Sequence, residues 1–96
     1  MSQAQGLDAC VRGLRDEMID FTKELVAVAS ENPPGNAYPE CVRVITSRLR
    51  ALGLPCEEVP FRGRNRSSAG AVTVLSSVGA GTRTLYFSGH YDVCRW

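Results

Sequence analysis

Apolar residues recur at helical spacing through the first third of the chain. Six of them lie 3, 4, 3, 4 and 3 positions apart and would form one stripe along a helix: Val11, Leu14, Met18, Phe21, Leu25 and Val28. The charged residues between them fall mostly off this stripe. We therefore expect a helix over residues 8–29, with Asp8 as its N-cap, Gly13 as a weak point in its first turns, and the stripe packed against a core.

A second helical pattern follows a rigid loop. The first helix must end before Pro33, because a residue that precedes proline is pushed out of the α region, and residues 30–36 hold two prolines and a glycine. The second pattern begins near Pro39 and repeats 3, 4 and 3 apart at Val42, Ile45, Leu49 and Leu52. Gly53 suits the left-handed position that ends a helix, and Pro55 prevents its continuation.

Beyond Pro55 the pattern becomes that of strands. Residues 56–59 predict a short edge strand, and residues 71–78 alternate as a strand with one buried face should. Residues 83–88 are apolar on both faces, which predicts a strand inside a sheet. The order α, α, β, β, β indicates an α/β domain in which helices cover a sheet.

Size and charge limit the classes of function. The chain has 96 residues, enough for one small domain or part of a larger one, and its net charge of +1 provides no overall attraction to nucleic acid or to anionic membrane. No apolar run approaches the ~20 residues of a membrane span, and the first residues are too polar for a secretory signal, so we expect a cytoplasmic protein. The four cysteines are scattered and contain no C-x-x-C pair, which favours packing over metal or redox chemistry.

The candidate chemistry lies near the carboxyl end of the chain. His90 is the single histidine, and Asp92 follows two positions later, directly after the predicted interior strand. In an extended segment residues i and i+2 project to the same side, so the imidazole and the carboxylate would share one space and Tyr91 would point away. A carboxylate that accepts the hydrogen of one ring nitrogen orients the ring and makes the other nitrogen a better zinc ligand.

Four segments together resemble a known family. They are residues 24–26, the loop at residues 30–36, residues 49–54 and residues 87–93, the last reading Phe-Ser-Gly-His-Tyr-Asp-Val. In this order and spacing the chain resembles, from about residue 14 to residue 93, the zinc-dependent amidohydrolases and exopeptidases that include acetylornithine deacetylase, succinyl-diaminopimelate desuccinylase and the carboxypeptidase G type.

The resemblance implies a hydrolase of amide bonds in N-acyl amino acids or peptides. It implies a zinc-exopeptidase-like layered catalytic domain with two zinc ions, replaceable by other divalent metals such as cobalt, and an inserted domain that mediates homodimerisation. His90 matches the first metal ligand of the family, and Asp92 matches the catalytic acid beside it. The remaining ligands and the glutamate base lie downstream in the family and have no match here.

The incomplete set of ligands shapes the prediction for the whole chain. We expect residues 1–96 to be an amino-terminal fragment of such a domain, produced by truncation or a frame shift and inactive alone, since a catalytic zinc needs about three protein ligands. A makeshift metal site of His90 with Cys94 would require a helical terminus and is disfavoured. The alternative is a non-catalytic α/β fragment that pairs with a longer relative through its strand edges. Nucleic-acid binding through Arg62, Arg64 and Arg66 is the least favoured interpretation.

Overall fold

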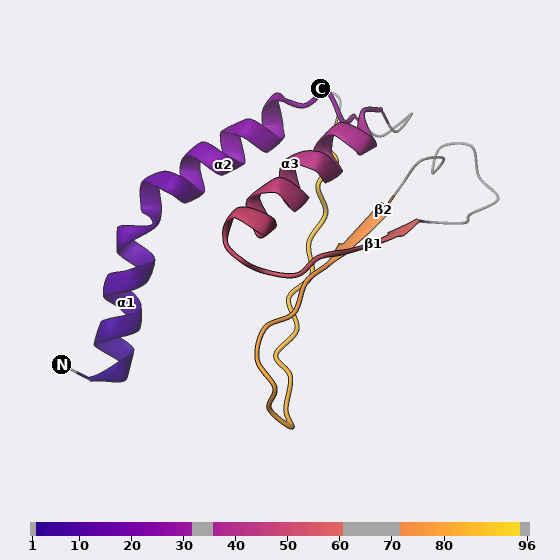
Figure 1. Cartoon of the computed structure of the whole chain (residues 1–96). Coiled ribbons are helices and arrows are strands. Elements are labelled where there is room, and N and C mark those ends of the chain that lie inside the picture. Colours follow the sequence, from indigo (N-terminus) through magenta and orange to yellow (C-terminus); the bar gives the residue numbers. More distant parts are fainter. Residues whose placement is uncertain (1, 32–35, 61–71, 95–96) are drawn as a thin grey trace.

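The computed structural model of the chain describes residues 2–31, 36–60 and 72–94. Within these residues the chain forms helices α1 (Gln3–Gly13), α2 (Arg15–Ala27) and α3 (Tyr38–Ala51) and a small sheet of strands β1 (Glu57–Pro60) and β2 (Val72–Leu75), labelled in Figure 1. The two strands form an antiparallel pair. This mixture of helices and a small sheet is compatible with the predicted α/β class.

The first helix begins earlier than the sequence pattern predicts. Ser2 caps α1, because its hydroxyl accepts the backbone N–H of Gln5 at 3.2 Å while the Gln5 side chain accepts the backbone N–H of Ser2 at 2.9 Å. Asp8 is therefore not an N-cap. Asp8 lies within α1, and its exposed carboxylate pairs with the guanidinium of Arg12 at 2.8 Å, one helical turn later.

A break at Leu14 divides the predicted helix over residues 8–29 into α1 and α2. Leu14 has φ −92° and ψ 1°, and its N–H bonds to the carbonyl of Val11 at 3.1 Å, a tighter turn than that of an α-helix. The preceding residue is Gly13, which has a low helix propensity and leaves the backbone free to depart from α geometry. The prediction of one continuous helix is wrong at this point.

The apolar stripe is partly buried, and only in its second half. Figure 1 shows α1 and α2 as a bent arm, with α1 pointing away from the sheet. Val11, Leu14 and Met18 are exposed, whereas Phe21 is half-buried with the guanidinium of Arg48 lying 5.2 Å from its ring centroid. The prediction of a core-facing stripe is wrong for the part on and beside α1.

Helix α3 contains most of the small core. Tyr38, Cys41, Val42 and Thr46 are buried on one face of it, at the spacing of successive helical turns. The helix ends as predicted, with Gly53 at φ +76°. The N–H of Gly53 bonds to the carbonyl of Arg50 and that of Leu54 to the carbonyl of Leu49, both at 2.9 Å, which is a Schellman motif.

The sheet is small and open. Val72 pairs with Pro60 and Leu75 with Glu57, and β1 is exposed along its whole length, as expected for an edge strand. In β2 the valines at 72 and 74 are half-buried while Thr73 and Leu75 are exposed, which confirms the predicted alternation for residues 72–75. The predicted extension of this strand to residue 78 is wrong, because β2 ends at Leu75 and Val78 is 84% exposed. Because Pro60 has no N–H, it suits the last position of this strand pair.

The predicted interior strand over residues 83–88 is absent from the structure. These residues form one arm of a long excursion that leaves β2 and returns to the carboxyl end, seen at the bottom of Figure 1. Leu85, Tyr86 and Phe87 are 80%, 73% and 83% exposed. A strand that is apolar on both faces needs neighbours on both sides, and the described residues offer only the two short strands.

The whole arrangement is more extended than a compact domain of this length. Its radius of gyration is 15.9 Å, whereas about 12.5 Å is typical of a compact domain of this length. Among the described residues only Tyr38, Cys41 and Val42 are buried apolar side chains. In the same part of the chain, every helix is too short or too polar to cross a lipid bilayer.

Candidate functional site

The structure brings His90 and Asp92 together. Nδ1 of the imidazole lies 2.8 Å from a carboxylate oxygen of Asp92 and 3.1 Å from its backbone carbonyl oxygen. Both of these oxygens can only accept, so Nδ1 carries the hydrogen and Nε2 of the neutral ring presents a lone pair. The His90 side chain is 82% exposed and that of Asp92 is 28% exposed, so the free nitrogen faces solvent.

Tyr91 points to the opposite side of the segment. Its hydroxyl contacts both backbone polar groups of Val72, accepting the N–H at 3.2 Å and donating to the carbonyl at 2.8 Å. Its ring meets that of Tyr38 edge to face, with centroids 5.6 Å apart. The side chains of residues 90 and 92 lie on one side and that of residue 91 on the other, as in an extended backbone. Residues 90–92 are nevertheless not part of a strand in the described structure.

The end of α2 supports the same segment from its other side. Ser30 is fully buried, its hydroxyl donates to the carbonyl of Tyr91 at 3.3 Å, and its own carbonyl accepts the N–H of Val93 at 3.2 Å. Glu31 and Val93 form a single parallel β-bridge. Sequence analysis did not identify these contacts of Ser30 and Tyr91, and the inclusion of both residues in the segments that resemble the hydrolase family was the available signal.

Burial and a nearby charge raise the pKa of Tyr38, whose ring packs against that of Tyr91. Burial raises the pKa of Tyr38 above the ordinary value of 10.0, and the charge of Asp92 and the neighbouring Tyr91 raise it further. A neutral phenol is therefore favoured beside the Asp92 carboxylate, which avoids a second negative charge next to the candidate site.

The described residues do not make a complete metal site. No group of three or more histidine, cysteine, aspartate or glutamate side chains is suitably placed within the described ranges. The disfavoured pairing of His90 with Cys94 also lacks its structural requirement, because residues 91–94 are not helical. In the described part of the chain the site offers one imidazole nitrogen, Nε2 of His90, and one ligand is too few to hold a catalytic zinc. The roles of His90 as metal ligand and of Asp92 as catalytic acid stay predictions.

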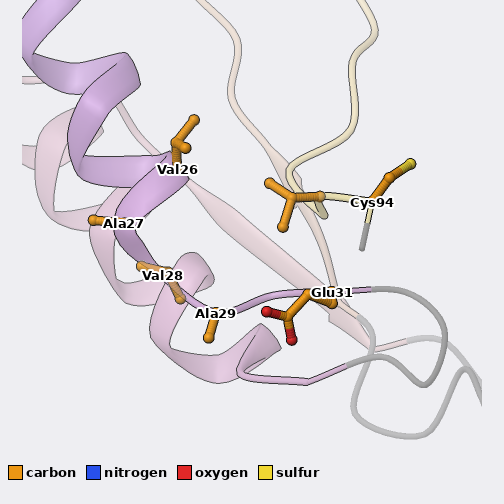
Figure 2. A pocket seen from close by; sticks show the side chains of 7 residues that line it. Val26, Ala27, Val28, Ala29, Glu31 and Cys94 are labelled. Carbon is orange, nitrogen blue, oxygen red and sulfur yellow. The ribbon is translucent and has the colours of Figure 1, made fainter. Parts of the chain in front are cut away.

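A pocket of about 570 Å³ lies at the carboxyl end of α2. Figure 2 shows the apolar side chains of residues 26–29 on one side and Glu31 and Cys94 on the other, and Val93 completes the lining. Neither His90 nor Asp92 lines it. The pocket therefore belongs to the junction between the end of α2 and the carboxyl-terminal segment rather than to the His90–Asp92 pair.

The cysteines differ in their surroundings, and all four are free. Cys41 is fully buried and packs as a small apolar residue, as expected, and Cys56 is partly buried. Cys10 and Cys94 are exposed. The packing role expected for Cys10 is therefore wrong, because α1 has nothing packed over it at that position.

Two sequence-based expectations fall outside the described residues. One is the conformation of the loop at Asn32–Gly35, and the other is the arginine-rich loop with Arg62, Arg64 and Arg66, the candidate nucleic-acid patch. The carbonyl of Glu31 accepts the N–H of Asn36 at 3.1 Å, so the two ends of the first loop lie close together.

Comparison with known proteins finds a likeness to one hydrolase. The chain is 37% identical over 78 residues to a succinyl-diaminopimelate desuccinylase of Burkholderia multivorans, and the match covers 76% of this chain and 18% of that protein. The chain thus spans less than a fifth of the length of this relative. No family model matches the chain. No solved structure matches it either. The likeness supports a relationship to a part of a hydrolase.

Proposed function

We propose that this chain is the amino-terminal part of a metal-dependent hydrolase that cleaves an amide bond of an N-acyl amino acid or peptide. The observation that carries the proposal is the exposed Nε2 of His90, whose ring is oriented by a 2.8 Å contact with Asp92. The likeness to a desuccinylase supports the same class of reaction. The proposal places the chain in the zinc-dependent family that its motifs resemble.

In this proposal His90 is a metal ligand and Asp92 is the acid that fixes its tautomer. The Asp92 carboxylate keeps the hydrogen on Nδ1, so that the Nε2 lone pair is directed outward and is available to a metal. The other ligands and the general base would come from polypeptide beyond the described residues. The chain alone is then inactive, because it offers one imidazole where a catalytic zinc needs about three ligands.

A chimera tests the proposal. This chain would replace the matching segment of the Burkholderia multivorans desuccinylase, and hydrolysis of succinyl-diaminopimelate would be measured with Zn²⁺ or Co²⁺. We expect activity in the chimera, its loss in His90→Ala, and its retention in Lys23→Ala, which changes an exposed residue of α2. A folded chimera that keeps full activity after His90→Ala would contradict the proposal.

The exposed apolar segment at residues 85–87 favours a second candidate function, that of an interaction fragment. Leu85, Tyr86 and Phe87 are each at least 73% exposed, and contiguous exposed apolar residues mark sites of protein–protein interaction. In this case the chain pairs with a longer desuccinylase-like protein and has no chemistry of its own. Co-purification with such a protein, lost in Leu85→Ser with Phe87→Ser, would support this function. A monomer that gains no partner in its presence would argue against it.

A further inference from the structure

The segment that carries His90 and Asp92 is held from two sides by residues far away in the sequence. On one side, the hydroxyl of the fully buried Ser30 donates to the carbonyl of Tyr91, and the carbonyl of Ser30 accepts the N–H of Val93. These two bonds fix the backbone immediately before and after Asp92. Ser30 thereby joins the end of α2 to the candidate site.

On the other side, Tyr91 anchors the segment to the sheet and to α3. Its hydroxyl satisfies both the N–H and the carbonyl of Val72, the first residue of β2. Its ring packs edge to face on the buried Tyr38, with the ring planes at 85°. Tyr91 is thus fixed in both position and rotation.

His90, in contrast, has almost no packing of its own. With 82% of its side chain exposed, its orientation depends on the Asp92 contact and on the backbone that sets the spacing of the two side chains. Because residues i and i+2 of an extended segment share a side, fixing the residue between them on the opposite side determines where both project.

We propose that Ser30 and Tyr91 are positioning residues, which hold the backbone of residues 90–92 so that Asp92 keeps the hydrogen of His90 on Nδ1 and the lone pair on Nε2. This inference rests on the proposed function, because it assigns a purpose to the presentation of Nε2. It assigns Ser30 and Tyr91 a role in the candidate site that they exert through the backbone of residues 90–92.

The tautomer of His90 provides a direct readout. His90 is the single histidine, so its ring nitrogens give one unambiguous set of signals in ¹⁵N-labelled chain. Spectra would be recorded at about pH 8.5, where an ordinary imidazole is neutral. We expect the Nδ1–H form to predominate in the unaltered chain. A ring without tautomer preference, or one with the hydrogen on Nε2, would overturn the proposal.

Two single substitutions each remove one of the hydrogen-bonding groups that hold residues 90–92 in place. Tyr91→Phe deletes the hydroxyl that binds Val72 and keeps the ring against Tyr38, and Ser30→Ala deletes the donor to the Tyr91 carbonyl. We expect each to lower the ratio of Nδ1–H to Nε2–H forms by about two- to tenfold, the effect of one hydrogen bond of ordinary net strength. Matched controls are Tyr86→Phe and Ser77→Ala, which remove the same atoms from exposed residues and should leave the ratio unchanged.

The outcomes separate positioning from general stability. A change of tautomer in variants that keep their far-UV helical signal and the contact between the rings of residues 38 and 91 supports the proposal. An unchanged tautomer in both variants overturns it, and so does a change seen only when helical signal is lost. The tautomer readout needs neither metal nor substrate, so failure of the hydrolysis test leaves the positioning roles of Ser30 and Tyr91 standing. An unchanged tautomer in both variants removes those two roles and leaves the roles of His90 and Asp92 in the hydrolase proposal standing.

Discussion

Tyr38 and Tyr91 meet edge to face, with their ring centroids 5.6 Å apart and their planes at 85°. Tyr38 lies at the start of α3 and is one of the few buried apolar residues, whereas Tyr91 lies between the two residues of the candidate site. This contact connects the site to the core of the described structure. Changes to the core at Tyr38 are therefore expected to reach the site.

Alkaline pH should destabilise the fold through Tyr38. Burial first, and then the Asp92 charge and Tyr91, raise its pKa above the ordinary 10.0. The folded state holds this proton more tightly than the unfolded state, so the stabilisation is complete below the ordinary pKa and is lost as pH rises through the higher, folded value. Urea unfolding between about pH 9 and pH 11.5 measures this loss. Tyr38→Phe should show a smaller decline than the unaltered chain, and an equal decline would contradict the prediction.

Two glycine substitutions should have opposite effects. Gly53→Ala forces a side chain into the left-handed conformation at φ +76°, which should lower the free energy of unfolding by about 1–2 kcal/mol. Tolerance of alanine at residue 53 would be inconsistent with the Schellman motif.

Gly13→Ala places a better helix former at the break between α1 and α2, where an added Cβ meets nothing within 4 Å. It should increase the helical signal in circular dichroism.

Thiol labelling should follow the exposure of the cysteines. Cys10 and Cys94 are exposed and should react with a thiol reagent before unfolding, whereas Cys41, with 0% exposure, should react only as the chain opens. Time-resolved labelling followed by peptide mass spectrometry distinguishes the positions. Fast labelling of Cys41 under native conditions would show that the core around α3 is not closed.

The helices and turns that local sequence specifies were predicted best. The end of α3 follows from Gly53 and Pro55, and the alternation of β2 follows from its valines, since both depend on neighbours within a few residues. The single helix over residues 8–29 was wrong because periodicity cannot locate a break as small as the one at Leu14. The interior strand over residues 83–88 was wrong because its apolar faces require neighbouring strands that the described residues do not contain.

For the candidate site, the sequence predicted which side chains could share a space but not what holds them. The spacing of His90 and Asp92 was enough to expect that they project together, and the 2.8 Å contact agrees with that geometry. The supports from Ser30 and Val72 lie 61 and 19 positions from Tyr91 in the sequence. Contacts over such separations depend on tertiary structure, which the local pattern of a single sequence does not specify.

The exposure of the apolar segment at residues 85–87 can be tested by substitution of Phe87. Phe87→Ser should change the free energy of unfolding of the 96-residue chain by less than about 0.5 kcal/mol, because the side chain is 83% exposed. It should also reduce the binding of an apolar dye and any self-association. Val42→Ala, in the core, should cost about 1–3 kcal/mol. A loss of unfolding free energy for Phe87→Ser as large as that for Val42→Ala would mean that the segment at residues 85–87 is packed in solution.

The zinc content of the purified 96-residue chain is the most direct test that it carries only one ligand of a larger site. After dialysis against metal-free buffer, we expect well under one Zn²⁺ per chain, because the described residues contain no group of three suitable ligands. Retention of about two tightly held ions per chain, lost in His90→Ala, would contradict the account.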